Sequence, residues 1–172
     1  MKPVAVFVGP PGAGKTTVAS RVARALGVAL RDTDHDIEAN AGKSVADIFV
    51  EEGEPVFREL EVAAVAQALA EHEGVLALGG GAIVNPETRA LLAGHTVIFL
   101  DVDLSNAVAR VGMNRNRPLL LGNVRTQMKQ LMDARRPLYT EVASIIVDTN
   151  DRTTDEVAAD LVAQLTSKQG DA

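Results

Sequence analysis

One segment near the start of the chain has the composition and order of a phosphate-binding loop. The segment Gly9–Thr16 reads GPPGAGKT and matches the pattern G-x-x-x-x-G-K-[ST], between a run that predicts a strand and one that predicts a helix. Glycine lets the backbone approach phosphate closely, so that peptide N–H groups and the positive end of the helix dipole bind the anion. Lys15 would reach the β- and γ-phosphates, and the Thr16 hydroxyl would ligate Mg²⁺. The sequence therefore predicts a nucleoside triphosphate site.

Two carboxylates follow the second predicted strand. Asp32 and Asp34 are separated by one residue, and such residues share a face in extended backbone. Both could therefore point into the crevice beyond the strand ends, where ligands bind in open α/β sheets. One would hold a water of the metal shell, and the other would accept a hydrogen bond from an attacking hydroxyl. Two alternatives stay open: Asp34 could merely cap the next helix, and Asp101, at the end of a later strand-like run, could be the metal carboxylate.

A run of glycines and a basic stretch are further candidates for ligand binding. Gly79, Gly80 and Gly81 are consecutive, and the entropic cost of such a run favours close approach of the backbone to a ligand over a plain tight bend. The stretch Arg110–Arg136 contains seven basic residues and one acid, whereas the whole chain carries a net charge of −6. Within it, residues 112–123 are bounded by glycine and lack periodicity, which predicts a mobile loop. We expect a basic lid over phosphates, with a solvated helix face as the alternative.

Short apolar runs alternate with helical patterns along the chain. The predicted strands cover residues 4–8, 28–32, 75–78, 96–101 and 144–148. The predicted helices lie near residues 15–26, 34–40, 45–51, 55–71, 86–92, 104–111, 124–136 and 154–165, and residues 167–172 are expected to fray. Apolar strands that alternate with helices are typical of a parallel sheet covered on both faces. The long interval between the second and third strands predicts an additional helical region.

Length and composition bound the class of protein. The 172 residues suit a single domain. The net charge of −6 argues against a general nucleic-acid or membrane-surface binder. Cysteine is absent, which excludes disulfides, thiolate metal sites and cysteine nucleophiles. No apolar run suits a signal-peptide core or a membrane span, so we expect a cytoplasmic protein.

Taken together, these segments resemble the small bacterial shikimate kinases, within the nucleoside-monophosphate-kinase-like P-loop proteins. The resemblance covers essentially the whole chain and rests on the order and spacing of its motifs. These motifs are Gly9–Thr16, Asp32-Thr33-Asp34 with Ile37-Glu38, Phe57-Arg58 with Glu61, Gly79-Gly80-Gly81, Arg117-Pro118-Leu119-Leu120, Arg135 in the pattern Arg-x-Pro-Leu-Tyr, and Asp148-Thr149.

The resemblance implies a fold class and an activity. The fold would be an α/β, three-layer αβα P-loop fold in one domain over residues 1–172, with a five-stranded parallel sheet of order 2-3-1-4-5. Its core would comprise about residues 1–32, 75–111 and 138–166, with a helical substrate-binding region at about 33–61 and a mobile lid at about 112–123. The implied activity is ATP-dependent and Mg²⁺-dependent phosphorylation of the shikimate 3-hydroxyl, on the route to chorismate and the aromatic amino acids. Such enzymes are typically monomeric.

The resemblance also implies a role for individual residues. The catalytic residues would be Lys15, Asp34 and Arg117. ATP would contact Gly12, Ala13, Gly14, Lys15, Thr16, Thr17, Arg117 and Arg152. Shikimate would contact Asp34, Arg58, Gly79, Gly80, Gly81 and Arg135, and Mg²⁺ would be held by Thr16 and, through water, by Asp32. Arginine suits the shikimate carboxylate because its guanidinium binds a carboxylate in a bidentate way.

Several alternatives remain open at this point. Arg136 follows Arg135 directly, so either could bind the carboxylate, although the family pattern favours the arginine two residues before the proline. The chain could instead phosphorylate another small hydroxylated acid such as gluconate, or act as a nucleotide-dependent switch that uses Asp101. We interpret Tyr139 as a packing residue.

Overall fold

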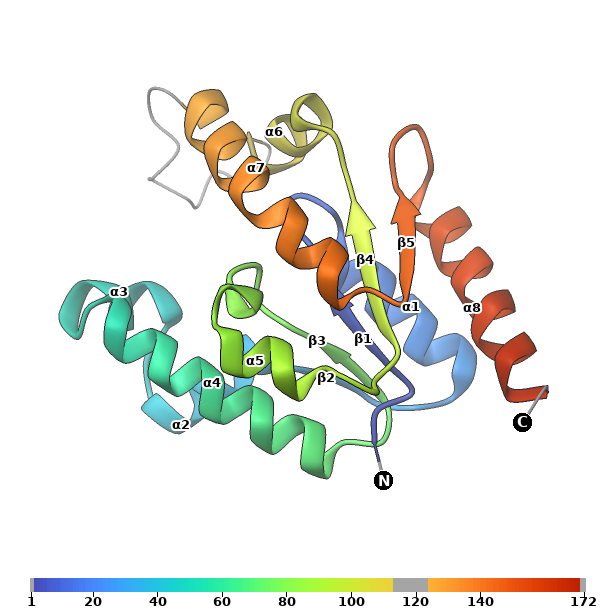
Figure 1. The fold of residues 1–172 in the computed structure, drawn as a ribbon, viewed down its shortest axis with the longest axis horizontal. Helices are drawn as coiled ribbons and strands as arrows, with labels where there is room; N and C mark the ends of the chain where they lie inside the picture. Colours follow the sequence, from blue (N-terminus) through green and yellow to red (C-terminus); the bar gives the residue numbers. More distant parts are fainter. Residues whose placement is uncertain (1, 113–123, 171–172) are drawn as a thin grey trace.

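The computed structural model of the chain describes residues 2–112 and 124–170, in which five parallel strands form one sheet (Figure 1). The strands are β1 Ala5–Val8, β2 Leu30–Asp32, β3 Val75–Ala77, β4 Val97–Asp101 and β5 Ile145–Asp148. Their order across the sheet is β2-β3-β1-β4-β5, and every neighbouring pair is parallel. This arrangement confirms the predicted sheet and its strand order.

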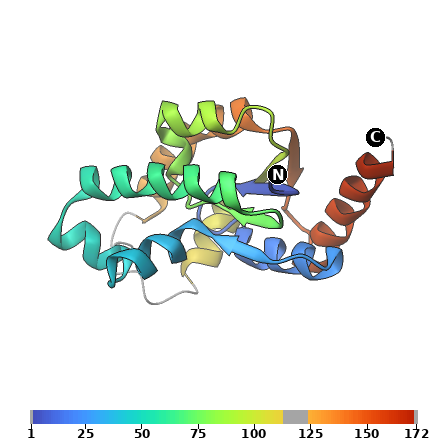
Figure 2. The same ribbon diagram turned by 90° about the horizontal axis from the view of Figure 1, so that it is seen from below.

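Helices connect the strands and cover both faces of the sheet (Figure 2). They are α1 Lys15–Leu26, α2 Thr33–Ala41, α3 Val45–Glu51, α4 Glu54–Glu71, the 3-10 helix η1 Ala82–Val84, α5 Pro86–Leu91, α6 Leu104–Gly112, α7 Val124–Val142 and α8 Thr154–Gly170. Buried side chains of α1 and α8 pack on one face, and those of α4 and the C-terminal part of α7 pack on the other. The predicted three-layer αβα architecture is therefore confirmed.

Burial on both faces explains why the strands are apolar without polar alternation. In β1, Ala5 and Phe7 belong to the core cluster shared with α1 and α8. Val6 and Val8 belong to the cluster shared with α4 and α7. Successive strand residues point to opposite faces, so a central strand that is covered on both sides needs an apolar residue at every position.

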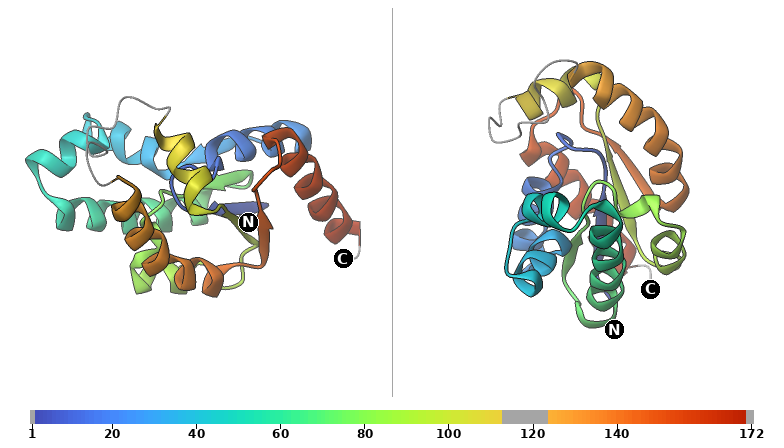
Figure 3. Two further views of the ribbon diagram at one scale, coloured as in Figure 1. Left: turned by 90° about the horizontal axis from the view of Figure 1, so that it is seen from above. Right: turned by 90° about the vertical axis from the view of Figure 1, so that its left-hand side faces the viewer.

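The helices α2, α3 and the first part of α4 project beyond the sheet, at the end opposite α8 (Figure 3). They have a small core of their own, which contains Ile37, Ile48, Phe57 and Ala64. Each of these helices has a defined start, because Asp32 caps α2, the Ser44 hydroxyl caps α3, and α4 begins directly after a glycine. The additional helical region predicted between the second and third strands is confirmed.

The prediction that a helix would end at Arg136 was wrong, since α7 continues through Pro137 to Val142. Proline removes one backbone donor and commonly breaks a helix. Beyond it, however, Leu138, Tyr139 and Val142 pack against the core cluster under α4, and burial of these side chains offsets the lost hydrogen bond. Sequence periodicity alone does not reveal that compensation.

Two further expectations concern the remaining parts of the chain. The prediction that the chain frays from residue 167 was wrong for residues 167–170, which belong to α8. The predicted lid, residues 112–123, lies outside the described residues except for Gly112, which ends α6. Among the residues described, no helix has the length and hydrophobicity needed to cross a membrane.

Candidate active site

The ends of β1 and β3 define the position where a ligand is expected. These two strands are neighbours in the sheet. After β1 the chain passes to α1, which packs on one face, whereas after β3 it passes through η1, whose Ala82 and Ile83 pack in the cluster on the other face. Such a divergence opens a crevice beyond the carboxyl ends of the strands, the usual ligand site of open α/β sheets. The phosphate-binding loop and the glycine run lie on its two sides.

The phosphate-binding loop has the close backbone packing that its glycines predict. A Cβ atom at Gly9 would lie 2.6 Å from the backbone oxygen of Leu100, and Gly12 and Gly14 have φ values of 84° and 85°. The ammonium of Lys15 donates to the carbonyl oxygens of Gly9 at 2.7 Å and Pro10 at 3.2 Å. The α1 helix starts at Gly14 without a side-chain cap, which suits an anion at its N-terminus.

Arg110, on α6, donates hydrogen bonds that hold the phosphate-binding loop in place. The sequence does not predict this contact. The Arg110 guanidinium donates to the carbonyl oxygen of Gly12 at 3.0 Å and to that of Thr149 at 3.4 Å. The basic stretch predicts a place for Arg110 near the lid. Its guanidinium instead joins the phosphate-binding loop to Thr149, directly after β5. A contact between residues so far apart in sequence leaves no local signal.

Asp32 and Asp34 lie at the junction of β2 and α2. The Asp32 carboxylate caps α2 by accepting a hydrogen bond from the Asp34 amide at 2.8 Å. The alternative that Asp34 is only a helix cap was therefore wrong, because Asp32 is the cap. The Asp34 side chain is directed instead toward the glycine run, where a Cβ at Gly79 would lie 2.8 Å from its Oδ1 atom.

The Asp34 carboxylate is in an environment that disfavours its charge. Its Oδ1 atom is buried and has no hydrogen-bond partner among the residues that the structure describes. Burial raises the pKa of the Asp34 carboxyl above its ordinary value, the negative charge of Asp32 raises it further, and the positive charge of Lys15 opposes the shift. A carboxylate of this kind is well suited to accept a proton from a bound hydroxyl.

Arg58 is oriented by a buried carboxylate. Its guanidinium donates to Glu61 at 2.8 Å, and Glu61 is only 2% exposed. The rings of Phe49 and Phe57 lie under the guanidinium, with centroids at 6.0 and 5.4 Å. The longer contact with Glu54 at 3.4 Å is the surface pair expected from helical spacing alone. Burial raises the pKa of Glu61, while the hydrogen bond and charge of Arg58 lower it.

The glycine run lies close to side chains of α4, of α7 and of the phosphate-binding loop. A Cβ at Gly81 would lie 2.6 Å from an Arg58 guanidinium nitrogen. At Gly80 it would lie 3.8 Å from Nη1 of Arg135 and 3.4 Å from Pro11 of the phosphate-binding loop. Gly81 has a φ of −100°, so its backbone is not left-handed, and a side chain there would instead displace the Arg58 guanidinium. The run therefore approaches side chains of this chain closely, and its predicted approach to a ligand stays a prediction.

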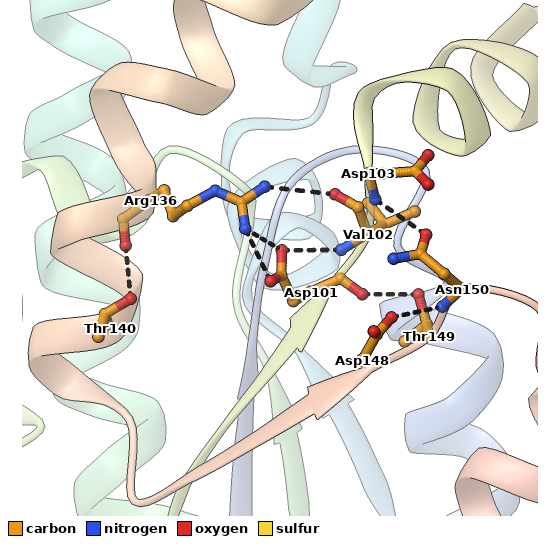
Figure 4. Close-up of polar contacts among 8 residues, drawn as sticks. All are labelled: Asp101, Val102, Asp103, Arg136, Thr140, Asp148, Thr149 and Asn150. Carbon is orange, nitrogen blue, oxygen red and sulfur yellow. Dashed lines mark hydrogen bonds and ion pairs between the residues drawn. The ribbon is translucent and has the colours of Figure 1, made fainter.

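The two adjacent arginines of α7 point to different places. Arg135 lies by Gly80, whereas Arg136 donates to both carboxylate oxygens of Asp101 at 2.7 Å (Figure 4). Asp101 also accepts a hydrogen bond from the Val102 amide at 2.9 Å. These contacts occupy Asp101 at the end of β4, so Asp32 is the better candidate for a metal carboxylate.

Two predicted ATP-contacting residues are not joined to this site by the described contacts. Arg152 interacts with α8, through the Glu156 carbonyl at 3.4 Å and the Asp160 carboxylate at 3.5 Å. Arg117 lies outside the described residues. Thr16 and Thr17 are exposed in the first turn of α1.

The donor set suits Mg²⁺ that arrives with a nucleotide. Within residues 2–112 and 124–170, no cluster of three or more metal-binding side chains is present. Mg²⁺ is commonly held by one or two protein oxygens together with water and substrate phosphates. The Thr16 hydroxyl and the Asp32 carboxylate supply oxygens of the required kind.

Comparisons with known proteins find relatives that match almost the whole chain. The family model described as Shikimate kinase matches residues 11–166. A shikimate kinase of Streptomyces avermitilis is 56% identical over 167 residues, which span 97% of this chain and 98% of that relative. The structure of shikimate kinase from Acinetobacter baumannii in complex with shikimate has a TM-score of 0.90 at 34% identity and covers 98% of this chain and 94% of that one.

A gluconokinase is similar in fold alone. The structure of a gluconokinase from Sinorhizobium meliloti has a TM-score of 0.58 at 19% identity, and it covers 95% of this chain and 91% of that one. The similarity extends to the architecture of the sheet and its helices, and it does not reach the level at which substrate choice is shared.

We expect Asp34→Asn to stabilise the protein at neutral pH. The raised pKa means that the folded protein binds more protons than the unfolded chain in the window above the ordinary value of 3.8, so the free energy of unfolding falls as pH rises through that window. An amide of the same shape avoids this cost. Thermal denaturation at about pH 7 should show a Tm increase of at least ~2 °C, which corresponds to ~1 kcal/mol for a chain of this size.

The control for this measurement is Asp36→Asn. Asp36 is paired with Arg31 at 2.7 Å, so its substitution removes an ion pair and is not expected to raise Tm. The advantage of Asp34→Asn should vanish at about pH 3, where both states are protonated. A lower Tm for Asp34→Asn at neutral pH would contradict the assigned desolvation.

Proposed function

The chain belongs to the shikimate kinase family, and on that premise we propose how its residues divide the work of the reaction. The enzyme transfers the γ-phosphoryl group of ATP to the 3-hydroxyl of shikimate, giving shikimate 3-phosphate on the route to chorismate and the aromatic amino acids. The observation that supports the division of roles is the contact of the glycine run with Asp34, Arg58, Arg135 and the phosphate-binding loop. The glycine run therefore lies next to the arginines and the aspartate that suit shikimate and next to the loop that suits ATP.

Shikimate binds beside the glycine run in this proposal. Its carboxylate pairs with the guanidinium groups of Arg58 and Arg135, since both lie against this turn and guanidinium matches carboxylate geometry. The ion pair with Glu61 holds Arg58 in place before shikimate arrives. The hydroxyl that reacts faces Asp34, and the backbone groups of Gly79–Gly81 approach the ring closely because no side chain intervenes.

Asp34 orients the attacking hydroxyl and receives its proton. As the bond from the shikimate oxygen to phosphorus forms and the bond from phosphorus to the leaving oxygen of ADP breaks, the hydroxyl proton passes to the Asp34 carboxylate. A pKa raised by burial makes that carboxylate a better proton acceptor than an exposed aspartate. Phosphoryl transfer depends mainly on positioning and neutralisation of charge, so Asp34 need not be a strong base.

ATP occupies the loop from Gly12 to Thr17 and the start of α1. Lys15, whose ammonium lies over the loop carbonyls of Gly9 and Pro10, exchanges those contacts for the β- and γ-phosphates. The resemblance to the family supports a second positive charge from Arg117, in the predicted lid at residues 112–123, and a contact of Arg152 with the adenine. Arg110 holds the loop to β5 by its bond to the Gly12 carbonyl.

The Thr16 hydroxyl would bind the Mg²⁺ that accompanies ATP, and the Asp32 carboxylate would hold the ion through water. When bound, the ion neutralises negative charge on the phosphates. Asp32 remains fixed for this role because it also caps α2.

We further propose that residues 1–172 form a single domain and that the enzyme acts as a cytoplasmic monomer on free ATP and shikimate, without a nucleic-acid or membrane partner. The core would comprise about residues 1–32, 75–111 and 138–166, and the substrate-binding region about residues 33–61. The separate small core of α2, α3 and α4 supports that subdivision.

A coupled assay of ADP release tests the proposed substrate directly. The full chain is assayed with ATP and Mg²⁺ and with shikimate, gluconate or no acceptor. We expect turnover with shikimate only. Turnover with gluconate would support a kinase of another small hydroxylated acid. Slow ATP hydrolysis at a rate that shikimate does not change would support a nucleotide-dependent switch.

We expect Lys15→Met to abolish turnover while the fold is retained. Loss of one charge that acts on the transferred phosphate typically lowers kcat by ~10²–10³. Steady-state assays together with circular dichroism check both parts. The assigned electrostatic role is wrong if the variant keeps more than about a tenth of the wild-type kcat.

Asp34→Asn should lower kcat strongly and leave ATP affinity within about twofold, because the amide cannot take a proton and Asp34 contacts the acceptor. Calorimetry of ADP binding and a steady-state assay measure the two effects separately. If nucleotide binding is lost while shikimate turnover persists, Asp34 serves the metal and the roles of Asp32 and Asp34 are exchanged.

The adjacent arginines provide a matched pair of variants. Arg135→Ala should raise the shikimate KM at least about tenfold, since a charge-assisted hydrogen bond contributes ~1.5–3 kcal/mol and tenfold is ~1.4 kcal/mol. Arg136→Ala should change it less than about threefold, because Arg136 is bound to Asp101. A large effect at Arg136 with a small one at Arg135 would show that Arg136, and not Arg135, binds the shikimate carboxylate.

A further inference from the structure

Tyr139 lies where the α7 helix meets the glycine run. Its side chain is 1% exposed, and its ring packs against Phe99 of β4 with centroids 5.0 Å apart. Packing alone would be satisfied by phenylalanine. The hydroxyl, however, donates a hydrogen bond to the carbonyl oxygen of Gly80 at 2.5 Å, the middle residue of the run.

The hydroxyl also has a second partner. A tyrosine hydroxyl has one hydrogen to donate and lone pairs to accept, and the Arg135 guanidinium, one helical turn earlier, interacts with the Tyr139 hydroxyl and lowers its pKa. The same guanidinium approaches Gly80 directly, with Nη1 3.8 Å from the position of a Cβ there. One hydroxyl therefore joins the arginine to the turn.

The carbonyl groups of the turn are each held by a different donor. The Gly79 oxygen accepts from the Ala82 amide at 3.1 Å, and the Gly81 oxygen accepts from the Val84 amide at 3.2 Å. The Gly80 oxygen accepts from Tyr139. Glycine has more backbone freedom than any other residue, so this side-chain bond restricts a peptide that would otherwise turn easily.

The bond to Gly80 also sets the direction of a neighbouring donor. In a trans peptide the carbonyl and the following N–H point in opposite directions, and no cis peptide is present in the described residues. Because the Gly80 carbonyl points at Tyr139, the Gly81 N–H points away from it. Its orientation therefore depends on the tyrosine hydroxyl.

We propose that Tyr139 is a positioning residue for shikimate, whose hydroxyl fixes the Gly80–Gly81 peptide and the Arg135 guanidinium relative to each other. Tyr139 acts through these two groups and does not itself touch the substrate. The inference rests on the proposed binding of shikimate beside the glycine run. Burial raises the pKa of Tyr139 to about 12, although the charges of Arg135 and Arg58 oppose the shift. The hydroxyl therefore keeps its proton, and with it the bond to Gly80, throughout the neutral range.

The test is Tyr139→Phe, which keeps the ring and removes only the hydroxyl. We expect the shikimate KM to rise about three- to tenfold, the range that corresponds to one lost hydrogen bond, while the ATP KM stays within about twofold. Calorimetry should show the same division between shikimate and ADP affinity. A purely structural tyrosine would lower stability without separating the two substrates.

Phe99→Leu is the matched control, because it disturbs the packing of the Tyr139 ring and leaves the hydroxyl. It should lower Tm and leave both KM values within about twofold. An unchanged shikimate KM in Tyr139→Phe, or an equal rise in both KM values, would overturn the proposal. In either case the wild type would still turn over shikimate, whereas failure of the proposed function would show as no shikimate-dependent ADP release by the wild type.

Discussion

A carboxylate held away from water against a glycine turn is the constraint on which the site depends. Oδ1 of Asp34 is buried, and a Cβ atom at Gly79 would approach it to 2.8 Å. This contact is possible only if β2 and β3 end side by side and Gly79 has no side chain. Burying the Asp34 charge costs stability. The same burial raises the pKa of the carboxyl, which makes it a better acceptor for the hydroxyl proton.

The rest of the architecture brings two kinds of binding chemistry to that point. Because all strands are parallel, their carboxyl ends lie at one edge of the sheet, and the loops that follow them meet there. The phosphate-binding loop supplies amides and Lys15, while α4 and α7 supply Arg58 and Arg135. The glycine run lies against Pro11 of that loop and against both arginines, so in the proposed function it separates the nucleotide from the acceptor. Arg136 anchors α7 to Asp101 at the end of β4, which leaves Arg135 beside the glycine run.

Local patterns predicted the parts of this molecule whose cause is local. Apolar runs marked the strands, and the glycine, lysine and threonine spacing marked the loop at Gly9–Thr16, because each reflects a requirement of its own segment. Resemblance supplied the strand order and the substrate. What the sequence could not indicate depends on distant partners: the Arg110 guanidinium on the loop and the Tyr139 hydroxyl on Gly80. The helix through Pro137 belongs to the same class, since packing against the sheet offsets the missing donor.

A crystal structure of the protein with ADP, Mg²⁺ and shikimate bound tests the central claim most directly, namely that both substrates meet at the glycine run. We expect the shikimate carboxylate between Arg58 and Arg135, its 3-hydroxyl beside Asp34, the β-phosphate of ADP on Gly12–Thr16, and Arg136 still paired with Asp101. Shikimate bound away from Gly79–Gly81, or Arg136 released from Asp101 to hold the carboxylate, would contradict it.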